Sequence, residues 1–160
     1  MALFTVDVVS RNHNSNYSET LLLNTEKVGN FYYDSSANGG SGGTVFFFAE
    51  NESRRTKSIR YETSLSHADF FDKFSQTVFR ESDMSPYRRR LNLSVVARGI
   101  NEEPWEKQVN VDAHKLIKAY DDGSYAIVEV DSGSFDKLVY KTLETISEIK
   151  SEYSTSVSAS

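Results

Sequence analysis

A basic stretch in the middle of the chain contains the residues best suited to binding chemistry. Residues 51–98 carry ten basic and six acidic side chains, whereas residues 99–160 carry six basic and twelve acidic ones. The basic side chains that could contact an anionic partner are Arg54, Arg55, Lys57, Arg60, Arg88, Arg89 and Arg90. Proteins that bind single-stranded nucleic acid combine such a basic track with aromatic side chains on a β-sheet. The segment 54–61, which includes Tyr61, therefore predicts contact with nucleic acid or with an acidic protein surface.

The rest of the sequence contains no recognisable catalytic, metal-binding or cofactor-binding motif. Cysteine is absent, which removes thiolate metal sites and cysteine nucleophiles. The three histidines, His13, His67 and His114, have no second ligand at a metal-binding spacing. No serine lies in a G-x-S-x-G motif, and the glycines at 39–43 match no phosphate-binding motif. We therefore expect no catalytic residues, no metal, no other cofactor and no small-molecule substrate.

The most hydrophobic run of the chain lies in a segment of three predicted strands joined by two turns, residues 30–63. Residues 44–49 are apolar on both faces of the expected strand, so each face needs a cover. One face is expected to join Ile59 and Tyr61 under helices of this chain. That face consists of Val45, Phe47 and Ala49.

The opposite face of the same strand has no obvious cover in the local sequence. It consists of Phe46 and Phe48. The glycine-rich loop before the strand is expected to be a flexible hairpin tip, because glycine adopts positive φ at low cost. We therefore predict a protein-contact surface formed by Tyr32, Gly39, Gly40, Gly42, Gly43, Phe46 and Phe48.

The periodicity of apolar residues predicts an α+β fold, an antiparallel sheet of hairpins with two or three helices packed on it. Besides those in 30–63, the expected strands are 2–9, 20–24, 91–97, 108–111 and 125–130. The expected helices are 68–80, 113–120 and a final one that opens at 132–134 and ends near Tyr153. The length indicates a single domain, 1–153, followed by a polar tail, 154–160. No repeat at a solenoid period is visible.

Two functions fit these patterns. The first is a non-enzymatic structural or assembly subunit that contacts other protein subunits in an oligomer or in a larger particle such as a virion. The two-faced apolar strand and the opposite charges of 51–98 and 99–160 favour it. The alternative is a single-stranded nucleic-acid-binding protein that uses the segment 54–61. Without a membrane-spanning run or a signal-peptide pattern, we expect no membrane contact and a location in the cytoplasm or inside a particle.

Overall fold

The fold is nearly all-β. The computed structural model of the chain describes residues 3–82, 90–99, 103–123, 125–133 and 135–159. Ten strands, mostly in antiparallel pairs, and only two α-helices lie within these residues. The prediction of an α+β fold with two or three helices on a sheet is therefore wrong. The chain divides into two compact units, which we call unit 1 (residues 1–50 and 56–82) and unit 2 (residues 51–55 and 83–160). The prediction of one domain over 1–153 stays a prediction.

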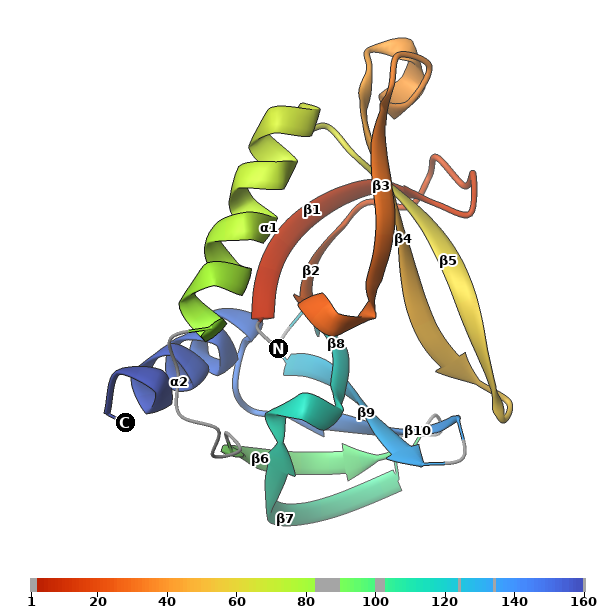
Figure 1. The fold of residues 1–160 in the computed structure, drawn as a ribbon. Coiled ribbons are helices and arrows are strands. Elements are labelled where there is room, and N and C mark those ends of the chain that lie inside the picture. Colours follow the sequence, from red (N-terminus) through yellow and green to blue (C-terminus); the bar gives the residue numbers. More distant parts are fainter. Residues whose placement is uncertain (1–2, 83–89, 100–102, 124, 134, 160) are drawn as a thin grey trace. The chain divides into compact units, whose positions relative to one another are not determined.

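Unit 1 contains five strands followed by a helix. Its elements are β1 (Leu3–Arg11), β2 (Glu19–Asn24), the short 3-10 helix η1 (Thr25–Lys27), β3 (Val28–Asp34), β4 (Gly43–Glu52), β5 (Arg55–Thr63) and α1 (His67–Ser82). The strands are ordered β3-β4-β5-β1-β2, and α1 lies along β1 (Figure 1). The predicted helix 68–80 is confirmed by α1. As expected, Ser66 caps this helix: its hydroxyl accepts a hydrogen bond from the Asp69 backbone N–H at 3.1 Å.

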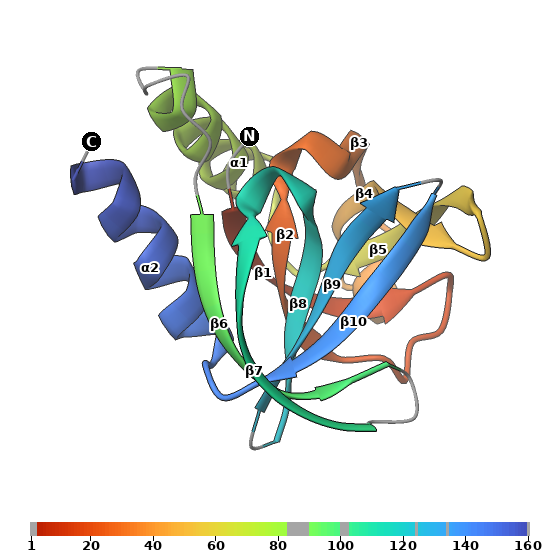
Figure 2. The same cartoon turned by 90° about the horizontal axis from the view of Figure 1, so that it is seen from below.

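Unit 2 also contains five strands followed by a helix. Its elements are β6 (Arg90–Arg98), β7 (Glu103–Asp112), the short 3-10 helix η3 (Ala113–Lys115), β8 (Leu116–Asp122), β9 (Tyr125–Gly133), β10 (Asp136–Thr142) and α2 (Ile146–Ala159). The strands are ordered β8-β9-β10-β6-β7; Figure 2 shows β8, β9 and β10 side by side. The backbone of α2 includes most of the stretch 154–160 that we expected to be a tail.

The two units therefore repeat one arrangement: a hairpin, a 3-10 turn, three more strands and a helix, with the same strand order in both units. The 3-10 turns are capped in the same way. The Asn24 side chain accepts a hydrogen bond from the Glu26 N–H at 2.9 Å, and the Asp112 side chain accepts one from the His114 N–H at 3.0 Å. In each unit an Asx side chain thus turns the chain from the second strand into the third.

The first strand of each unit has the same irregularity in its pairing with the fifth strand. The register between β1 and β5 shifts between Val8 and Ser10, and that between β6 and β10 shifts at the corresponding place, opposite Val95 and Ala97. Such a shift marks a β-bulge, which bends the strand and increases its twist. The strands end in similar sequences, Val-Val-Ser-Arg (8–11) and Val-Val-Ala-Arg (95–98). The residues that follow them, Asn12 and Gly99, both have positive φ.

One predicted helix is mostly a strand, and the first half of another is a strand. In 113–120 only the first three residues are helical, and β8 begins at Leu116. The stretch after Gly133 forms β10, and α2 begins only at Ile146. In both cases a run of consecutive apolar residues fitted a helical period as well as an extended one, and cross-strand pairing decided the outcome.

The core of unit 1 lies on the opposite face of β4 from the one we predicted. Phe46 and Phe48 are fully buried: Phe46 packs on Phe70 of α1 at 5.2 Å between ring centroids and on Tyr61 at 5.4 Å. Phe47 is only half-buried, on the other face. The reason is the two-residue turn Ser53-Arg54, with φ of 53° and 63°, which fixes the hairpin register and places Phe46 with Tyr61. The chain's own helix therefore supplies the cover that we expected from a partner.

The core of unit 2 is aliphatic. Its fully buried members include Leu91 and Leu93 on β6, Val128 on β9 and Ile149 on α2. Ile149 corresponds to Phe70, since each follows a capping hydroxyl by four residues and donates its backbone N–H to the carbonyl of that capping residue at 3.0 Å. Burial of one such side chain contributes about 1.5–3 kcal/mol.

Candidate nucleic-acid interface

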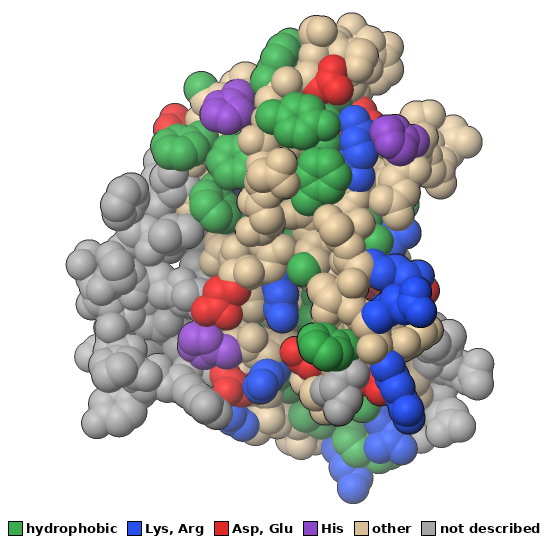
Figure 3. All heavy atoms as spheres, turned by 45° about the vertical axis from the view of Figure 1, so that its right-hand side comes forward, with side chains coloured by type: hydrophobic (Ala, Val, Ile, Leu, Met, Phe, Trp, Pro, Cys, Tyr) green, Lys and Arg blue, Asp and Glu red, His purple; other side chains and the backbone are tan. Residues whose placement is uncertain are grey.

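The outer face of β3, β4 and β5 carries an aromatic pair, the exposed Tyr32 and the half-buried Phe47. Tyr32 is 41% exposed, and its ring centroid lies 6.3 Å from that of Phe47 on the neighbouring strand, with 34° between the ring planes. The two side chains share a face because they alternate with the buried residues of the same strands. Figure 3 shows hydrophobic side chains gathered over this part of the surface, next to basic and histidine side chains. The pair forms an open aromatic platform on the sheet of unit 1.

Arg60 lies beside that pair, on the same face of β5. Its guanidinium donates to Glu62 Oε2 at 2.6 Å and lies 3.9 Å from Asp34 Oδ2. It also forms a side-chain hydrogen bond with Tyr32 and lies 3.4 Å from the Nδ1 atom of His13. The arginine side chain is only 15% exposed. Arg60 is thus fixed in place next to Tyr32, and two carboxylates offset its charge.

The glycine-rich loop between β3 and β4 is tied to the same network. The backbone N–H of Asn38 donates to Glu62 Oε1 at 2.9 Å. Burial by itself would raise the pKa of Glu62, but the hydrogen bonds from Asn38 and Arg60 hold that pKa below its ordinary value. Gly42 and Gly43 are buried, and a Cβ atom on Gly43 would lie 2.1 Å from the carbonyl oxygen of Thr63. Gly42 and Gly43 are thus held close to the sheet, and of the loop's glycines only 39 and 40 are exposed. The flexibility of the loop stays a prediction.

Among the predicted basic residues that the structure describes, Arg60 does not share its strand face with Arg55 and Lys57. Arg55 and Lys57 are exposed, but they lie on the face of β5 opposite to Arg60, because side chains alternate along a strand. Arg54 is 84% exposed, with its guanidinium Nε 3.6 Å from Asp136 Oδ2 and its backbone N–H bonded to Asp136 Oδ1 at 3.0 Å. Arg90, at the start of β6, donates to the backbone oxygen of Asn110 at 3.3 Å. Arg88 and Arg89 lie outside the described residues.

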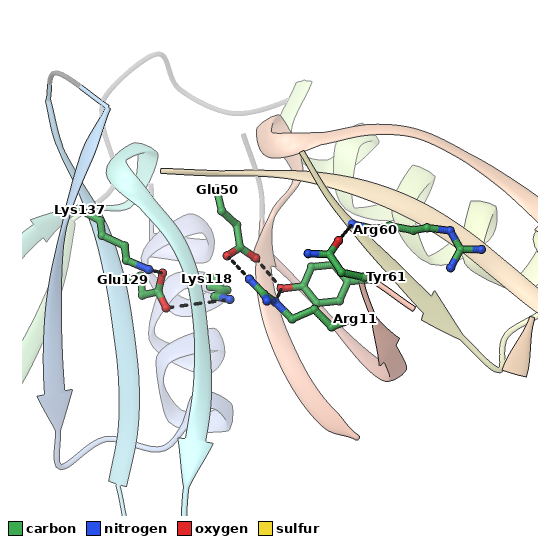
Figure 4. Close-up of polar contacts among 8 residues, drawn as sticks. Arg11, Glu50, Arg60, Tyr61, Lys118, Glu129 and Lys137 are labelled. Carbon is green, nitrogen blue, oxygen red and sulfur yellow. Dashed lines mark hydrogen bonds and ion pairs between the residues drawn. The ribbon is translucent and has the colours of Figure 1, made fainter. Parts of the chain in front are cut away.

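Sequence reasoning missed a lysine cluster on the outer face of unit 2. Lys118 on β8 and Glu129 on β9 are each 5% exposed, and Lys137 on β10 donates to Glu129 Oε1 at 2.9 Å. The Lys118 ammonium lies 4.0 Å from Glu129 Oε2 (Figure 4). It also lies 5.7 Å from the ring centroid of Tyr120. The cluster borders a pocket of about 300 Å³, lined by Gly99, Tyr120, Asp122, Ile127, Glu129, Lys137, Val139 and Lys141. The lysine cluster could be found from sequence only if the pairing registers of β8, β9 and β10 were known.

A second polar group lies on the helix-facing side of unit 1. The Tyr61 hydroxyl donates to Glu50 Oε2 at 2.5 Å, and the Arg11 guanidinium lies 3.4 Å from Glu50 Oε1 (Figure 4). Burial, followed by the negative charge of Glu50, raises the pKa of Tyr61, so the hydroxyl keeps its proton. Glu50 is only 3% exposed, and its carboxylate is occupied by these two partners. The group stabilises the core and offers no open position for a reacting molecule.

The described residues hold no grouping of three or more His, Cys, Asp or Glu side chains that could bind a metal ion. In the same part of the chain, no helix is long and apolar enough to cross a membrane. Comparison of the chain with protein-family models, curated proteins and solved structures gives no match. The case for a function therefore depends on the surfaces described above.

Proposed function

We propose that this chain is a non-enzymatic protein that binds single-stranded nucleic acid on the outer face of β3, β4 and β5. The observation that carries the proposal is the aromatic pair formed by the exposed Tyr32 and the half-buried Phe47 on the outer sheet face. Each base that stacks on such a platform contributes about 1–3 kcal/mol, and stacking tolerates any sequence because every base has a π-face. The basic hairpin segment 54–61 that we first considered contributes Arg60 to this face.

Arg60 orients the bound strand. A guanidinium plane next to an aromatic ring can stack on a base and donate to a phosphate at the same time. Glu62 and Asp34 neutralise much of its charge, and the whole chain has a net charge of −5. Few phosphates are therefore neutralised on binding, so affinity depends on stacking more than on counterion release. A shallow salt dependence is the signature that this site predicts.

Fluorescence anisotropy with labelled single-stranded oligonucleotides tests the proposal. Changing Tyr32→Ala or Phe47→Ala should weaken binding at least about fivefold, the equivalent of losing one stacking contact. Phe71→Ala is the matched control, because Phe71 is an exposed aromatic residue on α1, away from this face, and its loss should leave affinity unchanged. Circular dichroism confirms that each variant is folded. A wild-type protein that binds no oligonucleotide at low salt would end the proposal.

The second candidate function is a structural or assembly subunit that contacts other protein subunits. A different surface favours it, an aromatic cluster at the start of α1. The rings of His67 and Phe71 are stacked with 14° between their planes, and Phe31 lies 5.4 Å from His67. Phe71 is 50% exposed. Exposed aromatic clusters are typical of protein-contact surfaces.

Light scattering after size-exclusion chromatography distinguishes this candidate from the first. An assembly subunit should form a dimer or larger oligomer that the Phe71→Ala variant dissociates, with oligonucleotide binding unaffected. A wild-type monomer across the accessible concentration range would contradict self-assembly. Either function places the protein where nucleic acid or its partner subunits are present, in the cytoplasm or inside a particle such as a virion.

A further inference from the structure

The pocket on unit 2 occupies the same place in its sheet as the aromatic face of unit 1. Tyr120 pairs across the sheet with Ile127, as Tyr32 pairs with Val45. Asp122 and Asp34 end the two equivalent strands. These cross-strand partners fix the correspondence, and the shared features are a tyrosine, a strand-ending aspartate and a β-branched residue.

The remaining four positions on this face differ between the units in side-chain size and in charge. Where unit 1 has Phe47, Ser58, Arg60 and Glu62, unit 2 has Glu129, Lys137, Val139 and Lys141. The correspondence follows from the shared registers: Phe47 and Glu129 each lie two residues after the aligned β-branched residue. The other residues lie one, three and five positions before the aligned threonines of β5 and β10. Replacement of a long arginine by Val139, together with Gly99 beside it, leaves the space of about 300 Å³.

The pocket has the chemistry of a nucleotide site. Its volume is at the lower end of the range for small-molecule sites, enough for one ring and one phosphate. Tyr120, Lys137 and Lys141 line the pocket. The Lys137 ammonium donates to Glu129 Oε1 at 2.9 Å, and the Lys141 ammonium lies 5.3 Å from the ring centroid of Tyr125. The lining holds two lysines, Lys137 and Lys141, and two carboxylates, Glu129 and Asp122, so its formal charges balance and a phosphate contact depends on the individual lysines.

We propose that this pocket holds one nucleotide of a bound single strand, with the base against Tyr120 and a phosphate at Lys137 and Lys141. The inference rests on the proposed function, since it adds a contact for single-stranded nucleic acid on unit 2. The two faces make different kinds of contact with nucleic acid. Unit 1 contributes stacking with little net charge, and unit 2 contributes the phosphate contact.

Oligonucleotide titration of the Lys141→Ala variant tests the inference. Glu129 is paired with Lys118 and Lys137, so the change at Lys141 leaves the buried Lys118–Glu129–Lys137 arrangement in place. Binding should weaken about three- to tenfold, and the slope of log K against log salt should become shallower by roughly 0.7, the value for one lost phosphate contact with a single strand. Lys115→Ala is the matched control, because Lys115 is an exposed lysine on η3 of the same unit and does not line the pocket.

Three outcomes separate the possibilities. If the wild-type protein binds no oligonucleotide, the proposed function fails. If it binds, Tyr32→Ala weakens binding, and Lys141→Ala changes neither affinity nor salt slope, the proposed function stands and this inference is overturned. If dTMP binds the pocket as tightly as the strand does, and Lys141→Ala abolishes its binding, the site takes a free nucleotide and the inference is also overturned. Photocrosslinking of a bromodeoxyuridine-labelled strand to the peptide that contains Tyr120 would support it directly.

Discussion

Unit 1 and unit 2 share one backbone arrangement, which we call the framework, and differ in the side chains on it. Both have the same strand order, the same Asx-capped 3-10 turn, the same bulge in the first strand and a hydroxyl cap on the helix. Their cores differ: the core of unit 1 includes large aromatic rings and a buried carboxylate, whereas the largest fully buried side chains of unit 2 are aliphatic. The shared positions are those at which the backbone requires a particular cap, turn or bend. The positions that differ are side chains on the two faces of the sheet, where many residues satisfy the same backbone.

The largest effect should come from removing the buried anchor of each helix. Phe70→Ala should lower the free energy of unfolding by about 3–5 kcal/mol, and Ile149→Ala by about 2–5 kcal/mol, because each leaves a cavity between helix and sheet. Urea denaturation followed by circular dichroism measures both. Phe71→Ala, on the exposed side of α1, serves as the control and should cost less than about 1 kcal/mol. If Ile149→Ala behaved like the control, the two helices would not be equivalent.

The buried carboxylate of unit 1 should produce the next largest effect. Glu50→Gln leaves Arg11 without its carboxylate partner and should destabilise the protein by about 1–3 kcal/mol. The corresponding position on β9, Ser132, is exposed, and Ser132→Ala should change stability by less than about 0.5 kcal/mol. The same denaturation experiment compares them. Equal effects at the two positions would show that Glu50 makes no special contribution to unit 1.

The helix caps should have nearly equal effects. Ser66→Ala and Thr145→Ala each remove a side-chain acceptor for a backbone N–H, that of Asp69 and of Glu148 respectively. Each should cost about 1 kcal/mol, whereas replacement by the alternative capping residue, Ser66→Thr or Thr145→Ser, should cost much less. A difference between the two units well outside this range would contradict the shared framework.

The smallest effect should be a pH dependence confined to unit 1. The pKa of Glu62 in the folded state is below its ordinary value of 4.5, so the stability that it contributes is complete above that value and is lost as the pH falls through the folded-state pKa. Glu62→Gln should reduce the loss of folding stability at low pH by less than about 1 kcal/mol, as expected for a single ion pair near the surface. Lys141→Gln, at the corresponding position of unit 2, should leave that loss unchanged. Stability curves between pH 6 and about pH 3 distinguish the two variants.

The strands and α1 were predictable because their signals are local. Alternating apolar residues marked β1 and β6, and Ser66 with Asp69 marked the start of α1. The helices predicted at 113–120 and from 132 onward failed because short apolar runs fit either period, and pairing with β9 selected the strand.

The repeat and the candidate site were not predictable in the same way. The repeat is visible in sequence only at a few framework positions, such as Val8-Val9 and Val95-Val96, and the spacing changes within it. Residues 35–42 join β3 to β4, whereas β9 begins at Tyr125, directly after the short turn that follows Asp122. The site depends on cross-strand register. Once the positive-φ turn Ser53-Arg54 is known, the register places Phe46 in the core and leaves Phe47 outside.

The pairing of the first strand with the fifth has a consequence for how the chain must fold. Arg11 of β1 pairs with Tyr61 of β5, which lies about fifty residues later in the sequence. One edge of β1 therefore stays unpaired until β5 is available. Because β6 has nearly the same Val-Val-x-Arg sequence, we expect it to compete with β1 for β5 when the whole chain is present at once. Synthesis from the N-terminus removes that competition, because β5 emerges before β6 exists. When the denatured chain is diluted into buffer, β1 and β6 are both present and compete for β5. Mispaired strands and slow rearrangement should therefore be more common in refolding in vitro than in folding during synthesis.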